Sequence, residues 1–393
     1  GDQCFIMSHI SNDSIPICSD SRFNVKVIHF DLESNPSKIS IFLEICGQRF
    51  FSRVTYQTIP SWEEVWRRCE ASCKPMLLGT LVAWECMRFM ALGGEVLELC
   101  DGLRLDSHTQ GIWSYCFLNQ FGEWRYRNNF RYRSAKYPKV ICSDGVEEPK
   151  VNSIYKNSSA SNLPERWLLT NGGGKDTLVG MTLLTNAKLN FDIYEAYLPV
   201  GGKSETQKLL LEKLRIKATT PNNQLITVNV EDNFFEMSDE VFHRMGVAVK
   251  HFKADFAVGH TANYLGFFPL IIYHGYAGIW FNIEASSDRT MVLWNGEKIN
   301  HQWCNSEEFQ KIASDLFAHL TKMNWFKGFS STLRGLNDTV IYAIASTQKR
   351  LLRETHSCNI NKPWCRKCPK CCFSYLMMSA TISESFALSV IGG

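Results

Sequence analysis

The sequence lacks any apolar run long enough to cross a lipid bilayer, which takes about 20 residues in a helix. Its longest apolar stretches, PLIIYHGYAGIWF and MLLGTLVAWECM, are interrupted by His, Gly or Glu. The first residues, GDQCFIMSHI, have no basic start followed by an apolar stretch, so we expect no signal peptide. These absences favour a globular protein of the cytoplasm.

A strong charge of either sign is also missing. The chain has 42 Lys and Arg against 39 Asp and Glu, a formal net charge of +3 over 393 residues. This balance predicts no general attraction to nucleic acid or to a membrane surface. No internal repeat or low-complexity tract interrupts the chain, and its length allows two domains with substantial cores.

The 15 cysteines do not form the even, regularly spaced set of a small secreted domain. We interpret most of those in the first half as small buried hydrophobic residues: Cys4, Cys18, Cys46, Cys69, Cys73, Cys86, Cys100, Cys116 and Cys142. A reducing compartment is therefore expected.

Two regions with different patterns indicate the domain organisation. Residues 23–60 alternate as antiparallel strands do, and residues 61–100 have helical periodicity that begins with a capping-box spacing at Ser61 and Glu64. The polar segment 143–164 is expected to be a linker. We therefore predict an α+β N-terminal domain over 1–155, for substrate binding or packing.

From residue 166 onward the chain alternates strand, glycine loop, helix, strand (FDIYEAYLPV), helix (ETQKLLLEKLRI) and strand (LITVNV). This order predicts an α/β domain with a parallel sheet over 160–393.

The glycine loop, TNGGGKDT at 170–177, fails both common phosphate-loop patterns. A Walker A loop would need Gly at Leu169 and Ser or Thr at Asp176, and the dinucleotide pattern would need Gly at Thr177. Glycine amides that open a helix still form an anion site. Because Asp176 would repel a phosphate unless a cation bridges them, Mg²⁺ is implied.

At these residues the sequence resembles the PP-loop (N-type ATP pyrophosphatase) superfamily, whose signature is Ser-Gly-Gly-x-Asp-Ser. The corresponding residues are Gly172, Gly173, Gly174, Lys175, Asp176 and Thr177, with Gly172 in place of the first Ser and Thr177 in place of the last. The resemblance implies an adenine nucleotide alpha hydrolase-like fold. It also implies that the loop binds ATP, that PPi is released and that a substrate oxygen is adenylated.

A cysteine cluster follows near the C-terminus, with the spacing C-x6-C-x2-C-x2-C at Cys358, Cys365, Cys368 and Cys371. Such thiolates can converge on one Zn²⁺, while an iron–sulfur cluster or no metal stay open as alternatives. Lys367 and Lys370 would offset part of the negative charge, and Cys372 is expected in the core. A similar cluster follows the PP-loop domain of the 7-cyano-7-deazaguanine synthases.

Further stretches resemble the UDP-N-acetylmuramoyl-L-alanyl-L-glutamate epimerases of peptidoglycan synthesis: FAVGHTANYLGFFPLIIYH, FNIEASS, KINHQWCNSEEF and, more weakly, FGEWRYRNNF. This resemblance implies that an acyl-adenylate makes the glutamate α-proton removable, with AMP and PPi as by-products. His260, Glu284 and His301 are then candidates for the base and acid, and Lys175 and Asp176 for catalytic roles. The asparagine in FNIEASS is not adjacent to Glu284, which departs from the family pattern.

A basic stretch, EWRYRNNFRYRSAKYPK at 123–139, leaves another class open, because ribonucleic-acid binders interleave Arg with aromatic residues. The alternative function is a PP-loop enzyme that modifies a nucleobase or tRNA. A simpler interpretation is an amphipathic strand pair that binds an anionic substrate, here a UDP-linked muramoyl dipeptide. A zinc-stabilised binding module without activity is the third hypothesis.

Overall fold

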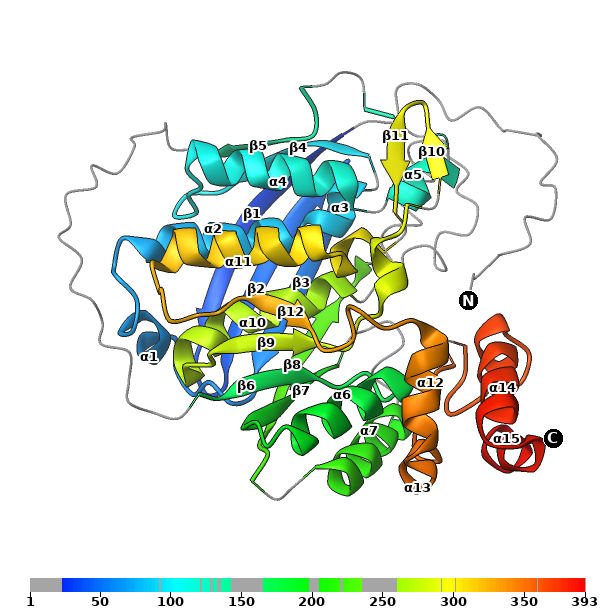
Figure 1. Cartoon of the computed structure of the whole chain (residues 1–393). Helices are drawn as coiled ribbons and strands as arrows, with labels where there is room; N and C mark the ends of the chain where they lie inside the picture. Colours follow the sequence, from blue (N-terminus) through cyan, green and yellow to red (C-terminus); the bar gives the residue numbers. More distant parts are fainter. Residues whose placement is uncertain are drawn as a thin grey trace.

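The computed structural model describes residues 23–142 and 165–392, apart from 198–204, 235–259, 133–135, 220–221 and positions 92, 121, 128, 130, 291, 301 and 359. The fold is mixed α/β, with a large, mostly parallel sheet (Figure 1). The predicted linker at 143–164 and residues 1–22 lie outside the described part.

The sheet has the strand order β12-β9-β6-β7-β8-β3-β2-β1-β4-β5. Its strands have these bounds: β1 Phe23–Glu33, β2 Ser37–Ile45, β3 Gln48–Tyr56, β4 Gly94–Leu99, β5 Lys139–Cys142, β6 Trp167–Thr170, β7 Phe191–Tyr197, β8 Leu225–Asp232, β9 Gly278–Phe281 and β12 Phe329–Ser331. A separate antiparallel hairpin joins β10, Val292–Trp294, to β11, Glu297–Ile299.

Helices fill most of the connections between these strands. Their bounds are α1 Trp62–Trp66, α2 Cys73–Glu85, α3 Met87–Ala91, α4 Ser107–Asn119, α5 Gly122–Arg127, α6 Lys175–Asn186, α7 Glu205–Ala218, α10 His260–His274, α11 Glu307–Thr321, α12 Asp338–Ser346, α13 Lys349–Leu352, α14 Pro369–Thr381 and α15 Glu384–Ile391. Short 3₁₀ turns lie at Ala285–Asp288 and Trp303–Asn305. In the part of the chain that the structure describes, no helix combines the length and the apolar character that crossing a membrane requires.

The C-terminal half of the chain supplies a parallel block, as predicted. Strands β6, β7 and β8 follow one another in the sheet, and β9 and β12 lie on the other side of β6. In chain order this is the 3-2-1-4-5 arrangement of a doubly wound sheet. The strand order reverses between β6 and β9, and ligands of such sheets bind outside the carboxyl ends of the strands at that point.

The N-terminal half supplies the antiparallel strands that residues 23–60 predicted. β1 pairs with β2 and β2 with β3, and β1 begins with strict alternation of buried and exposed residues. The helical prediction for 61–100 is wrong at its end, because residues 94–99 form β4, which pairs in parallel with β1. Nearly every side chain of β4 is buried, and its two glutamates, Glu95 and Glu98, have the i, i+3 spacing of one helix face, so the sequence lacks the alternation of a strand.

The two halves share one sheet and one core. β3 pairs antiparallel with β8, with Val54 opposite Val230. Above the strands, α2 packs against α10 and α11, and Figure 1 shows α2 and α11 side by side. The indole of Trp84 in α2 makes edge contacts with Phe268 at 6.0 Å and Phe309 at 5.6 Å. The division into domains at 155–160 stays a prediction, and the sheet continues across it.

Candidate functional site

The glycine loop connects β6 to α6 at the point where the strand order reverses. Gly173 has a φ of +77°, a left-handed conformation that favours glycine. A Cβ at this position would lie 2.1 Å from Cε1 of His356. The tight approach of the His356 ring and the backbone conformation both require glycine here.

Two side chains hold the loop in this conformation. The Gly173 amide donates to Oδ1 of Asn171 at 3.0 Å, and the Gly172 amide donates to Oγ1 of Thr177 at 3.0 Å. Gly174 is the N-cap of α6 and has no side chain to cap the first turn. The helix N-terminus therefore offers unpaired amides and a positive dipole end to an anion.

Lys175, the first residue of α6, is buried and lies between two carboxylates. Its Nζ is 2.9 Å from Oδ1 of Asp176 and 2.6 Å from Oδ1 of Asp338. Burial alone would lower the pKa of Lys175, but Asp176 and Asp338 outweigh burial and raise it above its ordinary value. The ammonium is therefore charged at neutral pH.

The next strand along the sheet delivers a third carboxylate. Asn282, directly after β9, donates from Nδ2 to the Thr170 carbonyl at 2.7 Å and so ties the end of β9 to the end of β6. Glu284 follows two residues later, and its Oε1 accepts a hydrogen bond from Ser286 at 2.7 Å.

Burial is the largest cause that raises the pKa of Glu284. The negative charge of Asp338 raises this pKa further, and the hydrogen bond from Ser286 and the charge of Lys175 oppose the rise. Glu284 thus lies within the electrostatic reach of the lysine and aspartates of the loop. A carboxyl group with a raised pKa can take and return a proton more readily near neutral pH.

The structure brings three of the predicted catalytic residues, Lys175, Asp176 and Glu284, into one neighbourhood. His260 is the first residue of α10, but its side chain lies outside the described part, as does all of His301. Asp338 was missed by the sequence analysis. In the sequence, Asp338 is distinguished only by its position in the first turn of a helix, and many carboxylates that have no functional role lie at such positions.

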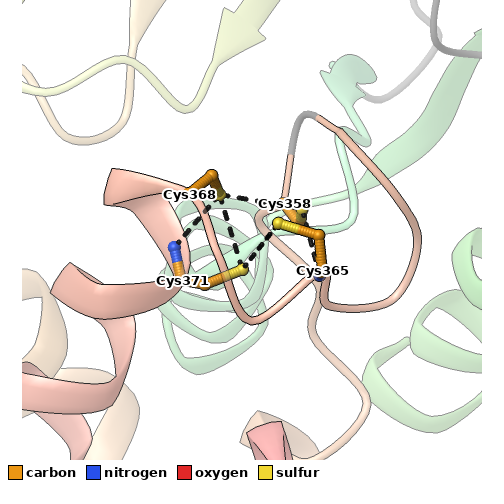
Figure 2. A group of neighbouring side chains, drawn as sticks. All are labelled: Cys358, Cys365, Cys368 and Cys371. Carbon is orange, nitrogen blue, oxygen red and sulfur yellow. Dashed lines mark hydrogen bonds between the residues drawn. The ribbon is translucent and has the colours of Figure 1, made fainter.

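The four predicted metal-ligating cysteines come together at the start of α14 (Figure 2). Cys358 and Cys368 have their Sγ atoms 3.8 Å apart, as do Cys365 and Cys371, and the Sγ atoms of Cys368 and Cys371 are 3.5 Å apart. Four sulfurs about 2.3 Å from one Zn²⁺ in a tetrahedron would be about 3.8 Å from one another. The cysteines therefore fit a metal such as zinc.

Backbone amides prepare one of these sulfurs, that of Cys358, for a cation. The Sγ of Cys358 accepts hydrogen bonds of 3.4 Å from the amides of Ile360, Asn361 and Cys365. Burial raises the pKa of Cys358, but these donors outweigh burial and lower it to about 6. Cys358 thus favours a thiolate before any metal binds, whereas burial raises the pKa of Cys368 and raises that of Cys371 to about 12.

Two predictions about the remaining cysteines need correction. Cys372 is exposed rather than in the core, because consecutive helical residues point about 100° apart and its neighbour Cys371 faces the cluster. In the first half, Cys73, Cys86 and Cys116 are buried, but Cys46 is exposed and the other described cysteines are half-buried.

A short segment connects the cysteine cluster to the glycine loop. The amide of His356 donates to the Gly173 carbonyl at 2.9 Å, and Oγ of Ser357 lies 3.3 Å from where a Cβ of Gly174 would be. Cys358, the first of the four clustered cysteines, is the next residue. The two motifs are therefore in backbone contact, although the chain places them far apart.

In its described residues, the basic stretch at 123–139 does not form the strand pair that we expected. Residues 122–127 form α5, where the guanidinium of Arg125 is buried and donates to the Gln120 carbonyl at 2.7 Å. Arg131 lies over the ring of Trp294, with 4.7 Å to its centroid. These two arginines have intramolecular roles in the fold.

No protein-family model matches the chain. It is similar to curated proteins named UDP-N-acetyl-alpha-D-muramoyl-L-alanyl-L-glutamate epimerase. One from Micromonospora sp. is 22% identical over 327 residues, covering 78% of this chain and 61% of the relative.

A second, from Xanthomonas oryzae pv. oryzae, is 22% identical over 303 residues, covering 74% of this chain and 60% of the relative. A third, from Salinispora tropica, is 26% identical over 132 residues, 31% of this chain and 28% of the relative. The chain thus spans about three-fifths of the length of the first two. The comparisons therefore show a distant similarity to curated epimerases of that name, across most of this chain.

Proposed function

We propose that this protein is an ATP- and Mg²⁺-dependent epimerase. It converts the terminal L-glutamate of a UDP-linked muramoyl-L-alanyl-L-glutamate to D-glutamate. The name of the relatives supports the substrate. The observation that carries the chemistry is the juxtaposition of Glu284 with the glycine loop, at the carboxyl ends of two neighbouring strands.

Gly172, Gly173 and Gly174 with the N-terminus of α6 would hold the phosphates of ATP, because their amides and the helix dipole favour an anion. Asp176 would hold Mg²⁺, which in proteins commonly binds one or two carboxylates together with substrate phosphates. The donor set fits a cation. Asp176, Asp338 and Glu284 can place three negative charges beside the single ammonium of Lys175.

ATP supplies the activation: a glutamate carboxylate oxygen bonds to the α-phosphorus, PPi leaves, and the resulting acyl group makes the α-proton more acidic. Glu284 is the proposed base that takes this proton, and His260 and His301 stay candidates for returning one on the opposite face. Water then cleaves the acyl–phosphate bond and releases AMP. Lys175 holds the carboxylates of Asp176 and Asp338 in place.

The decisive experiment uses UDP-N-acetylmuramoyl-L-alanyl-L-glutamate with ATP and Mg²⁺ in D₂O. The product is hydrolysed, and the glutamate enantiomers are separated and weighed by mass spectrometry. We expect D-glutamate that carries one solvent deuterium at Cα, only when ATP and Mg²⁺ are both present. A matched reaction with Asp176→Asn controls for contaminating enzymes.

Other outcomes would redirect the assignment. Unlabelled L-glutamate, together with AMP formation on a nucleobase or tRNA, would replace the epimerase with a nucleic-acid-modifying enzyme that uses the same loop. Failure to bind ATP at all would remove both activities and favour a zinc-stabilised binding module. Since the name of the relatives concerns a UDP-linked compound, we also propose that the protein acts in the cytoplasm.

A further inference from the structure

His356 is buried against the glycine loop, and its ring nitrogens have no hydrogen-bond partners among the described residues. The residue is 1% exposed, and neither ring nitrogen makes a hydrogen bond of acceptable geometry, although the backbone of Glu354 lies near the ring. A buried polar group without a partner is costly, and most such groups in folded proteins are hydrogen-bonded. Hydrogen bonding within the protein therefore does not account for the burial of the His356 ring. The contact of the ring with the glycine loop does account for it.

That contact is closely fitted. A Cβ on Gly173 would lie 2.1 Å from Cε1 and 2.4 Å from Nε2 of the His356 ring, and 2.9 Å from a methyl group of Leu211 in α7. The ring and this leucine thus fill the space beside Gly173. The backbone of the same residue also contacts the loop, because the His356 amide donates a hydrogen bond of 2.9 Å to the Gly173 carbonyl.

The segment that carries His356 is itself anchored by the cysteine cluster. Cys358 is buried, and its sulfur accepts three backbone amides and lies 3.8 Å from the sulfur of Cys368. A metal held by the four sulfurs would fix Cys358, and only Ser357 separates Cys358 from His356. The same segment also approaches Gly174, because Oγ of Ser357 lies 3.3 Å from where a Cβ of Gly174 would be.

We propose that His356 is a positioning residue that couples the cysteine centre to the glycine loop, so that metal loss at the centre weakens nucleotide binding at the loop. The ring sets the position of Gly173 by contact, and the backbone amide sets the direction of its carbonyl. The cysteine centre then stabilises the phosphate-binding conformation of the glycine loop, in addition to its contribution to the stability of the fold. The nucleotide-binding part of this inference rests on the proposed function.

The first arm of the test removes the ring and leaves the cysteines in place. In His356→Ala we expect zinc content equal to wild type and an affinity for MgATP and for inorganic pyrophosphate about tenfold lower, which corresponds to about 1.4 kcal/mol. His356→Gln, which retains a side chain of comparable length, should recover part of that loss. Wild-type affinity in His356→Ala would overturn the positioning role.

A double-mutant cycle tests the contact itself. Gly173→Ala places a methyl group against the His356 ring, so its effect on MgATP affinity should be smaller in the His356→Ala background than in wild type. Some loss will persist in both backgrounds because the positive φ strains alanine. Strictly additive effects of the two substitutions would contradict direct contact between the ring and the loop.

The second arm removes one metal ligand and compares it with a neighbouring cysteine. Cys368→Ser should lose the metal, whereas Cys372→Ser, the same exchange at an exposed cysteine one turn along α14, should keep it. In Cys368→Ser we expect faster hydrogen–deuterium exchange at the amides of Gly172, Gly173 and His356, and unchanged exchange in β4. Unchanged exchange at the loop would overturn the coupling.

The two hypotheses fail separately. If wild-type protein binds neither MgATP nor pyrophosphate, the proposed function is wrong, while the exchange experiment still decides whether the centre supports the loop. If wild type binds MgATP and both His356→Ala and metal-depleted protein bind it equally well, the coupling is wrong and the proposed function stands.

Discussion

The ammonium of Lys175 lies 2.6 Å from the carboxylate of Asp338, and both side chains are only 11% exposed. Lys175 opens the helix after the glycine loop, and Asp338 opens α12 much later in the chain. This buried pair joins the two helix N-termini that meet at the candidate site. Four predictions follow from this neighbourhood and from the cysteine centre.

Asp338→Asn should destabilise the fold, because it leaves a buried lysine with only Asp176 as its charged partner. Loss of one member of a buried ion pair that keeps a second partner should cost about 1–3 kcal/mol. Urea unfolding followed by tryptophan fluorescence measures the change. Glu205→Gln, which removes the exposed partner of Lys208, is the matched control and should change stability by less than about 0.5 kcal/mol. Equal effects of the two substitutions would contradict a structural ion pair at Lys175.

Asp176→Asn should lower Mg²⁺-dependent PPi release by at least about 100-fold, because the proposed metal-binding charge is lost. The amide retains the shape of the partly exposed side chain, so the circular dichroism spectrum should change little. The melting temperature should fall no further than in Asp338→Asn, because Lys175 keeps Asp338 as its charged partner. A coupled assay for PPi gives the rate. Hydrolysis of ATP to ADP and phosphate at the wild-type rate would show that the loop does not release pyrophosphate.

Purified protein should contain about one zinc per chain, because four sulfurs lie at tetrahedral distances. Cys368→Ser should lower the zinc content and the melting temperature, since the binding energy of a structural metal contributes to folding. Elemental analysis of freshly purified protein measures the metal, with Cys372→Ser as the control. Iron with sulfide in place of zinc would indicate an iron–sulfur cluster. Protein that contains neither zinc nor iron would contradict the proposed metal centre.

The rate of deuterium incorporation at Cα should fall when the pH is lowered. This fall should occur at a higher pH than it would if the base were a glutamate of ordinary pKa. Burial raises the pKa of Glu284, so this carboxyl group binds its proton at a higher pH, and the protonated form cannot act as a base. The rate is therefore present above this raised pKa and is lost as the pH falls through it.

Glu284→Gln supplies the control for this pH profile. It should lower deuterium incorporation by about 100- to 10,000-fold while PPi release on ATP persists. If this variant exchanges deuterium like wild type, another residue must be the base. His260 and His301 would then be the next residues to substitute.

Much of the local structure was predictable from the sequence. The alternation in residues 23–60 indicated the antiparallel strands, and the glycine loop between an apolar strand and a helix is where it was expected. The cysteine spacing indicated a cluster that the structure brings together. These features depend on neighbours in the chain, so periodicity and spacing carry the information.

The glycine loop, its lysine and aspartate, and the four cysteines could be identified from local patterns, because each set lies within one short segment. The neutralisation of Lys175 by Asp338 and the contact of His356 with Gly173 could be found only in the folded chain. The same is true of the pairing of residues 94–99 as a strand with β1. Such contacts join segments far apart in the chain, and their geometry is set by the packing of the sheet and its helices, which no local pattern contains.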